Sequence, residues 1–375
     1  MTLEQKKILV VKIGSSTLVN SEGRLDGAYL ASLAFQISAI RDAGWIPIIV
    51  TSGSIACGLE ALDMTERPSD TPTLQAAASV GTNILFSAYA HAFERYDMLT
   101  SVVLITRQIT ADREQYLHVR DTLERLLDLG VVPIINENDT VSVEQLRFGD
   151  NDTLAALVAC LVKAQLCVIF SDIDGLYTAN PFEDPTATLI EEVASITPEL
   201  MAVAGGSSST VGSGGMITKI RAARVLMAAG IDLVICNGRN TDSLVRLTAG
   251  ERVGTRFSPL AKAHDITPKK LWIALGDTAK GAVIVDEGAR EALVSRGSSL
   301  LAVGVRGVEG SFACEDIIDI IDGSGHIIAR GKAGASSSEV TLACGRSQKE
   351  IKGNELLANL AQHPVVHRDD LVVFE

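Results

Sequence analysis

The chain has 375 residues, 47% of them hydrophobic but only 4% aromatic, and a formal net charge of −13. At roughly 100 to 200 residues per domain, this length indicates two or three domains, and the high apolar content excludes a disordered or fibrous chain. The excess of negative charge argues against a nucleic-acid-binding protein, because it would repel a phosphate backbone.

The apolar segments are too short to cross a membrane. The longest uninterrupted run, Leu154–Val162, has nine residues, whereas a spanning helix needs about 18 to 20. The polar segment Met1–Lys7 leads directly into an apolar run and has no signal-peptide layout, which predicts a cytoplasmic protein. The six cysteines contain no C-x-x-C spacing and most lie in apolar runs, so we expect reduced core thiols.

Up to about residue 258, short β-branched runs alternate with longer segments of helical periodicity, which is typical of β-α-β units. The predicted strands are Ile8–Ile13, Ile46–Thr51, Thr100–Thr106, Val131–Asn136, Leu166–Ser171 and Ile231–Asn237. The predicted helices are Asp26–Ala43, Thr73–Tyr96, Arg113–Leu129, Asp152–Lys163 and Met216–Ala229. Most strands are apolar on both faces, as in a sheet covered by helices on each side. The sequence therefore predicts an α/β fold, a three-layer α/β/α sandwich with a mostly parallel sheet.

The pattern changes after Pro259 to short strands and frequent glycines, with one predicted helix near Glu287–Arg296. This pattern favours a small β-barrel-like domain over residues 277–357. We therefore expect a first domain over 1–260, a linker over 261–276, the second domain, and a tail over 358–375. The tail ends in an apolar run and is either a terminal strand or a loose segment.

The commonest nucleotide-binding motifs, G-x-x-x-x-G-K-[ST] and G-x-G-x-x-G after a strand, are absent, and so is the G-x-S-x-G turn of serine hydrolases. Instead, several clusters rich in Gly, Ser, Asn and Asp follow the predicted strands. Because ligands of open α/β sheets bind at the carboxyl ends of the strands, these clusters are the candidate site.

The first two clusters are suited to an anion. Lys12 lies inside an apolar strand, directly before a turn at Gly14. A buried lysine is costly unless paired, which favours a phosphate partner over a lysine that only reaches solvent from the strand end. The second cluster, around Ser52 and Gly53, offers backbone N–H groups to an anion, although an ordinary serine-capped turn would look the same.

The third cluster combines carboxylates and amides in Asn136–Asp139 and again in Phe148–Asp152, more than helix capping requires. Such groups suit the binding of an ammonium group and the orientation of a lysine or a magnesium ion.

The fourth cluster, Ser171–Tyr177, turns toward Asn180-Pro181 and frames a nucleotide base or ribose, or else is a simple Asp-Gly hairpin turn. The fifth, Gly205–Lys219, has the composition of a flexible linker. Because it leads into a helix with a lysine in its first turn, we interpret it as a phosphate-binding loop.

Together, these segments resemble the amino acid kinase family over about residues 10 to 235. The matching stretches are VVKIGSS, TSGSIACG, INENDTVS, RFGDNDTLAALVA, SDIDGLYTANP and GSGGMITKIRAA, in that order. Within the family, the chain is similar to members that phosphorylate glutamate. From about residue 277, GAVIVDEGAREALVSRGSSLLAVGV resembles a PUA domain, which members acting on acetylglutamate or uridylate lack.

The resemblance implies a role for each matching residue. For catalysis it implies Lys12, Asp152 and Lys219, with Asp152 organising the two lysines. For glutamate it implies Ser52, Gly53, Asn136, Asp139, Asp150 and Asn151, with Asp139 pairing with the α-ammonium group. For ATP it implies Lys12, Gly14, Ser171, Asp172, Ser213, Gly214, Gly215, Met216, Ile217, Thr218 and Lys219. No metal-ligating residue is predicted.

The implied reaction is the ATP-dependent phosphorylation of the side-chain carboxylate of L-glutamate to glutamyl 5-phosphate, the first step of proline biosynthesis, with Mg²⁺ bridging ATP oxygens. A carboxylate with a pKa of about 4.3 is already ionised at neutral pH, so this acceptor needs no general base. The resemblance further implies feedback inhibition by proline, hand-over of the product to glutamyl phosphate reductase, and a homodimer or homotetramer.

Two alternatives stay open. The chain is another kinase of the family, such as an acetylglutamate kinase, or it binds RNA through its second domain. The segment Asp277–Glu375 has 10 basic and 15 acidic side chains, which argues against RNA.

Overall fold

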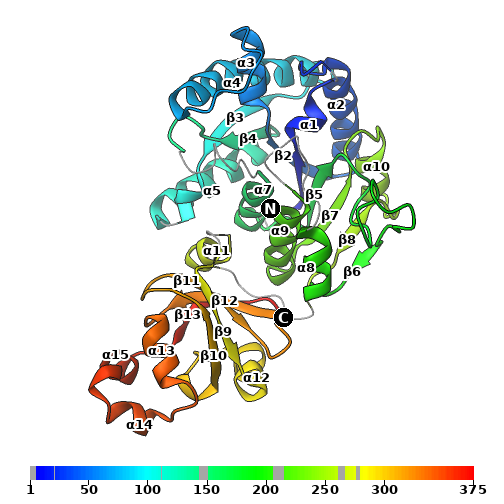
Figure 1. Ribbon diagram of the computed structural model, residues 1–375. Helices are drawn as coiled ribbons and strands as arrows, with labels where there is room; N and C mark the ends of the chain where they lie inside the picture. The colour runs from blue at the N-terminus through cyan, green and yellow to red at the C-terminus, as the bar shows by residue number, and fades with distance from the viewer. Residues whose placement is uncertain are drawn as a thin grey trace. The chain divides into compact units, whose positions relative to one another are not determined.

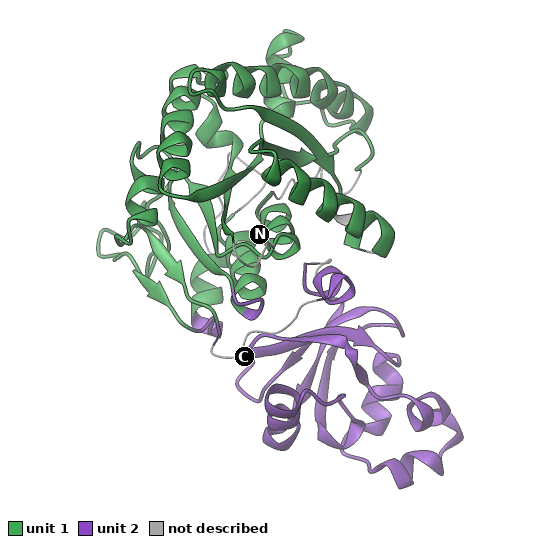
Figure 2. Ribbon diagram, turned by 180° about the vertical axis from the view of Figure 1, so that it is seen from behind, with its two compact units in different colours: residues 1–194, 200–227, 231–259 green, residues 195–199, 228–230, 260–375 purple. Residues whose placement is uncertain are grey.

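The computed structural model describes residues 6–20, 22–110, 112–142, 151–205, 215–260, 267–275 and 279–375. The chain divides into two compact units (Figure 2). The first comprises residues 1–194, 200–227 and 231–259, and the second comprises 195–199, 228–230 and 260–375. Each unit has its own sheet and its own buried core.

An eight-stranded sheet in the order β3-β4-β2-β1-β5-β7-β8-β6 forms the middle of the first unit. Its strands are β1 (Lys7–Ile13), β2 (Trp45–Thr51), β3 (Thr100–Ile105), β4 (Val132–Glu137), β5 (Leu166–Ser171), β6 (Glu192–Val193), β7 (Asp232–Asn237) and β8 (Thr255–Phe257). Neighbouring strands are parallel except for the antiparallel pair β7 and β8. The mostly parallel sheet is thus confirmed, and each of the six predicted strands begins and ends within one residue of its expected position.

Helices cover both faces of this sheet. Figure 1 shows α2, α3 and α4 on one side and α5, α7 and α9 on the other. The helices of this unit are α1 (Ser15–Leu18), α2 (Gly27–Asp42), α3 (Ser54–Ala61), α4 (Thr71–Glu94), α5 (Arg113–Asp128), α7 (Asn151–Leu161), α8 (Pro198–Gly205), α9 (Met216–Ala228) and α10 (Ser243–Thr248), with a 3₁₀ turn η2 (Arg107–Thr110). The three-layer α/β/α sandwich is confirmed.

Local sequence determines where the long helices begin. Asp26, Asp70 and Asp112 each lie directly before a helix, and each accepts hydrogen bonds from backbone N–H groups of the first turn. Such caps satisfy donors that have no partner within the helix.

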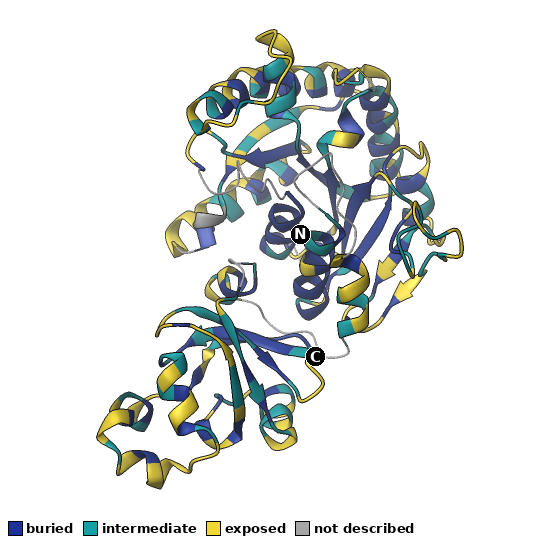
Figure 3. Ribbon diagram, viewed as in Figure 1, coloured by how far each residue is buried: buried dark blue, intermediate teal, exposed yellow. Residues whose placement is uncertain are grey.

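The alternation of side chains between the two faces of β1 determines which of them reach the site. Leu9, Val11 and Ile13 belong to the core shared with α2 and α4. Because successive side chains of a strand point to opposite faces, Lys12 faces the other layer, where α7 packs on β1. The central strands β1, β2, β4, β5 and β7 are mostly buried (Figure 3).

Helices α3 and α4 cross at two glycines. A Cβ atom on Gly58 would lie 1.8 Å from the carbonyl oxygen of Ala77, and one on Gly81 would lie 1.8 Å from that of Ser54. No other residue fits such a contact without a shift of the helices, so these glycines determine how closely α3 approaches α4.

The second unit contains a five-stranded sheet in the order β10-β9-β11-β12-β13. Its strands are β9 (Gly281–Val285), β10 (Val305–Gly310), β11 (Ile317–Ile321), β12 (Ile327–Ala333) and β13 (Val366–Val373). Its helices are α11 (Pro268–Leu275), α12 (Glu287–Arg296), α13 (Ser337–Ala343), α14 (Gln348–Lys352) and α15 (Ala358–Gln362), with 3₁₀ turns η3 (Ala302–Gly304) and η4 (Glu355–Leu357).

Two segments of this unit differ from a simple linker and tail. The predicted linker contains α11, which packs on β12 and β13, and Leu271 and Ile273 of this helix are fully buried. The tail contains β13, which pairs antiparallel with β12. The expected alternative of a terminal strand is therefore the one observed, because Leu371 and Val373 contribute to the core of this unit.

The six cysteines are free thiols, of which Cys314 is exposed. Among the residues that the structure describes, none of the helices combines the length and the apolar character of a membrane span.

Candidate active site

Three charged side chains meet at the carboxyl end of the central strands. Lys12 comes from β1, Asp152 from the first turn of α7, and Lys219 from the first turn of α9. Lys12 Nζ lies 2.7 Å from Asp152 Oδ1, and Lys219 Nζ lies 3.2 Å from Asp152 Oδ2. The lysine side chains are 8% and 7% exposed and Asp152 is fully buried. Asp152 thus pairs with two buried ammonium groups at once.

This arrangement stabilises the charged form of Asp152. Burial alone would raise the pKa of Asp152, but the charges of Lys12 and Lys219 and hydrogen bonds from Lys12 and Thr218 hold it well below its ordinary value. The hydroxyl of Thr218 lies 2.8 Å from Asp152 Oδ2. The carboxylate therefore stays ionised near neutral pH and keeps both lysines oriented.

A network of amides and hydroxyls lies beside this cluster. Asn151, the residue before Asp152, directs its Nδ2 atom to the carbonyl oxygen of Thr51, to Ser52 Oγ at 2.8 Å and to Asn136 Oδ1 at 2.9 Å. Asn136 in turn donates from Nδ2 to Ser54 Oγ at 2.8 Å. The network ties the ends of β2 and β4 to the start of α7.

Two further predicted residues lie at the ends of the same strands. Gly53 has a φ of 100°, in the left-handed region that favours glycine, and it is the N-cap residue directly before α3. Asp139 follows β4 and is partly buried, and burial raises its pKa to about 6 although the charge of Arg67 acts in the opposite direction. A partly buried carboxylate of this kind gains from a cationic ligand, because such a ligand stabilises its ionised form.

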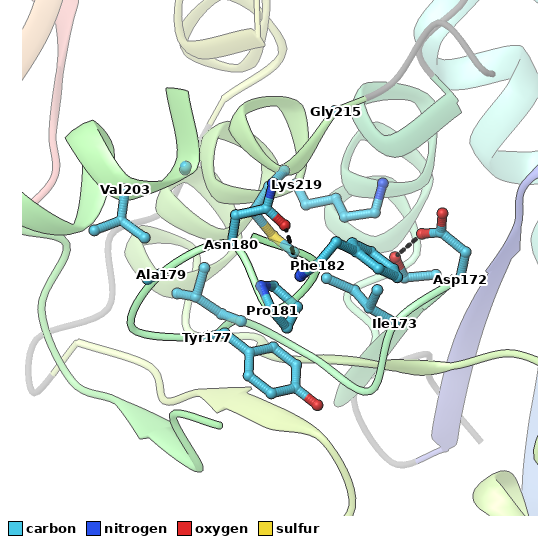
Figure 4. A pocket seen from close by; sticks show the side chains of 14 residues that line it. Asp172, Ile173, Tyr177, Ala179, Asn180, Pro181, Phe182, Val203, Gly215 and Lys219 are labelled. Carbon is cyan, nitrogen blue, oxygen red and sulfur yellow. Dashed lines mark hydrogen bonds between the residues drawn. The ribbon is translucent and has the colours of Figure 1, made fainter. Parts of the chain in front are cut away.

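A pocket opens where the loops after β5 meet the start of α9 (Figure 4). Its lining consists of Ser171, Asp172, Ile173, Leu176, Tyr177, Ala179, Asn180, Pro181, Phe182, Val203, Ala204, Gly215, Met216 and Lys219. Lys219 belongs both to this pocket and to the charged cluster, so the two are continuous. Phe182 is 81% exposed, and its backbone N–H donates to Asn180 Oδ1 at 3.1 Å.

The structure places most of the predicted site residues together. The catalytic candidates Lys12, Asp152 and Lys219 are in direct contact, and Ser52, Asn136 and Asn151 share one hydrogen-bond network. Of the ATP candidates, Ser171, Asp172, Gly215, Met216 and Lys219 line the pocket. Gly14 adjoins Lys12 instead, since a Cβ atom added at Gly14 would lie 3.5 Å from Lys12 Nζ.

The remaining candidates are not among the described residues that line the pocket, and their roles stay predictions. Thr218, predicted to bind ATP, contacts Asp152, and Ile217 is not among the described residues that line the pocket. Asp150, Ser213 and Gly214 lie outside the described residues.

Sequence reasoning missed part of the pocket lining. Phe182, Val203 and Ala204 were not predicted, although Phe182 directly follows the Asn180-Pro181 turn that was. Val203 lies on α8, two residues before the cluster that begins at Gly205, and its apolar side chain gives no sign of a binding role.

Comparison with known proteins agrees with this arrangement. A sequence model of the amino acid kinase family matches residues 7–237, and one of the PUA domain matches residues 281–353. Glutamate 5-kinase of Paraburkholderia phymatum is 43% identical over 365 residues, which cover 97% of each chain. Glutamate 5-kinase of Cupriavidus taiwanensis is 44% identical over 371 residues, which cover 99% of each chain. The chain therefore belongs to the amino acid kinase family, among the glutamate 5-kinases, and carries a C-terminal PUA domain.

Proposed function

We propose that the protein transfers the γ-phosphoryl group of ATP to the side-chain carboxylate of L-glutamate. The observation that carries this proposal is the buried Lys12–Asp152–Lys219 cluster, which presents two ammonium groups between a pocket and a polar network. The names of the full-length relatives support glutamate as the acceptor.

The chemistry joins two anions. An oxygen of the ionised glutamate side chain forms a bond to the γ-phosphorus, while the bond from that phosphorus to the bridging oxygen of ADP breaks. No proton has to move, because the carboxylate is ionised at neutral pH and ADP leaves as an anion. The barrier therefore depends on neutralising negative charge around the phosphoryl group.

Lys12 and Lys219 supply that charge. Asp152 keeps their ammonium groups in place before the substrates arrive, so little reorganisation is needed in the transition state. The turn at Gly14 brings backbone close to Lys12, and the start of α9 offers the positive end of a helix dipole. Asp152 thus acts through the lysines.

The two substrates fit on either side of this cluster. A nucleotide whose phosphates reach Lys219 would have its base or ribose among Tyr177, Asn180 and Phe182 in the pocket. Glutamate would be held by Ser52, Gly53, Asn136 and Asn151, with its α-ammonium group on Asp139. Asn151 and Asp152 are adjacent in α7, so one helix turn aligns the acceptor and the phosphoryl group.

The described residues of the site fit an Mg²⁺ ion that the nucleotide itself holds. Within the described part of the chain, no group of three or more His, Cys, Asp or Glu side chains is placed to hold a metal ion, and both oxygens of Asp152 face lysines. Mg²⁺ would therefore arrive on the phosphate oxygens and neutralise part of their charge.

Several further proposals follow from the family. They are feedback inhibition by proline, hand-over of the unstable acyl phosphate to glutamyl phosphate reductase, a homo-oligomer, and a cytoplasmic location, where ATP and glutamate are both present. We also propose that the kinase domain spans residues 1–260.

The test is ATP consumption by the purified full chain, with glutamate, acetylglutamate, aspartate and uridylate offered in parallel. Hydroxylamine is included because it traps an acyl phosphate as the hydroxamate. We expect glutamate to be the preferred acceptor by kcat/KM and to yield glutamyl hydroxamate. Preference for any other acceptor, or ATP consumption without hydroxamate, would overturn the proposal.

A further inference from the structure

The segment Asn237–Gly238–Arg239 begins at the last residue of β7, at the carboxyl edge of the sheet, where it contacts two loops of the proposed site. No motif marked it in the sequence, and its residues have no role in the reaction proposed above. Its contacts join the phosphate turn after β1 to the nucleotide loop after β5.

Arg239 is bonded to the loop that follows Gly14. Its Nη2 atom donates to the backbone carbonyl oxygens of Ser16, at 3.3 Å, and Val19. Its Nη1 atom lies 2.8 Å from Asp26 Oδ2, and its guanidinium carbon lies 5.6 Å from the centre of the Tyr29 ring. Asp26 also caps α2, so a single side chain binds α1, the loop after it and the start of α2.

The same segment is bonded to the nucleotide loop. The backbone N–H of Gly238 donates to the carbonyl oxygen of Ser171 at 2.9 Å, and Asn237 Nδ2 donates to Asp174 Oδ1 at 3.1 Å. The side-chain oxygen of Asn237 accepts the backbone N–H of Arg239 at 2.9 Å. The two sets of contacts are therefore linked through adjacent residues.

Gly238 allows α1 to pack directly on this segment. A Cβ atom at Gly238 would lie 2.7 Å from Thr17 Cγ2 and 2.8 Å from Phe170 Cβ. Thr17 of α1 is 2% exposed. The helix α1, which directly follows Gly14, thus packs against Gly238 and is hydrogen-bonded to Arg239.

We propose that Arg239 is a positioning residue that fixes the phosphate turn at Gly14 relative to the nucleotide loop at Ser171. It contacts neither substrate and acts through the backbone of Ser16 and Val19. An arginine suits this role, because its planar group donates in several fixed directions and is always charged, whereas a lysine offers a single point charge. The inference rests on the proposed function, because it assigns the turn to the transferring phosphoryl group.

The test compares Arg239→Gln with Arg239→Lys and with a control, Arg252→Gln, which removes the same charge. Arg252 lies in the same unit, is 84% exposed, and forms an exposed ion pair with Glu191 at 3.0 Å. For Arg239→Gln we expect kcat to fall about tenfold or more while the KM for glutamate stays within about twofold and the melting temperature within about 3 °C. Arg239→Lys should recover part of kcat, and the control should match wild type.

Hydrogen exchange of the backbone gives a readout that does not depend on the reaction. In Arg239→Gln, peptides that cover residues 14–26 should exchange faster than in wild type, and in Arg252→Gln they should not. Unchanged exchange and unchanged kcat would overturn the proposal. So would a loss of kcat that comes with an equal loss of glutamate binding and a large drop in melting temperature, which indicates general damage. If wild type itself does not phosphorylate glutamate, the proposed function fails, while the exchange result still tests the positioning role.

Discussion

The crossing of α3 and α4 leads to a prediction about glutamate binding. Gly81 of α4 lies so close to α3 that a Cβ atom would meet the carbonyl oxygen of Ser54 at 1.8 Å. An ordinary Cβ contact begins near 3.4 Å, so Gly81→Ala requires α3 and α4 to separate by about 1.6 Å. Ser54 is the first residue of α3 and accepts the 2.8 Å hydrogen bond from Asn136.

A displacement of about 1.6 Å at Ser54 would stretch this bond beyond hydrogen-bond range. Breaking a buried hydrogen bond costs about 1 to 3 kcal/mol, which corresponds to roughly 5- to 150-fold in affinity. We therefore expect Gly81→Ala to raise the KM for glutamate at least about fivefold. The KM for ATP should change little, because the proposed nucleotide pocket lies beyond β5.

The assay is steady-state kinetics with each substrate varied in turn, alongside the control Gly27→Ala. Gly27 is the first residue of α2, and its Cβ position has no heavy atom within 4 Å. The control should stay within about twofold of wild type, as expected for an open helical glycine. A glutamate KM within twofold of wild type in Gly81→Ala would refute the reasoning, since α3 would then not set the geometry of the glutamate site.

Three further predictions concern single residues. Because the pKa of Asp139 is raised to about 6, its carboxylate is mostly neutral below that pH. The affinity for glutamate, measured by calorimetry without nucleotide, should therefore fall by up to about tenfold per pH unit below pH 6. The variant Asp139→Asn should flatten this pH profile. A pH dependence that persists in the variant would show that another group is responsible. Asp152→Asn removes the buried carboxylate that pairs with both lysines, so the free energy of unfolding in urea should drop by about 3 to 5 kcal/mol. An unchanged midpoint would contradict the role of the cluster in holding these charges. Leu371→Ala removes a buried side chain from the core of the second unit and should destabilise that unit by about 2 to 5 kcal/mol in calorimetric unfolding. The control Arg368→Ala, at an exposed position of the same strand, should not. Equal effects of the two substitutions would argue against the assignment of this core.

The layered fold of the first unit could be predicted because its signals are local. The strands β1, β2 and β5 are largely apolar, and α2 and α4 begin at aspartate caps that are visible in the sequence. The short strands β6 and β8 were not predicted, because they are two and three residues long. Such segments are strands only through their partners in the sheet.

The proposed catalytic cluster could be anticipated for a similar reason. A lysine inside an apolar strand, as at Lys12, needs a partner, and Asp152 and Lys219 each lie in the first turn of a helix that follows a polar cluster. The roles of Thr218 and Arg239 were not foreseeable. Thr218 turns toward Asp152 because of its position around α9, and Arg239 meets Ser16 only when β7 and β1 are placed in one sheet.

The most direct test of the account is the effect of removing each lysine of the cluster on turnover and on ATP binding. In Lys12→Ala and in Lys219→Ala we expect kcat for glutamyl hydroxamate formation to fall about a hundredfold or more, while the dissociation constant of ATP rises less than about tenfold. Lys7→Ala, an exposed lysine at the start of the same strand β1, should leave both values unchanged. Near-normal turnover in either Lys12→Ala or Lys219→Ala would contradict the claim that these two ammonium groups stabilise the transferring phosphoryl group.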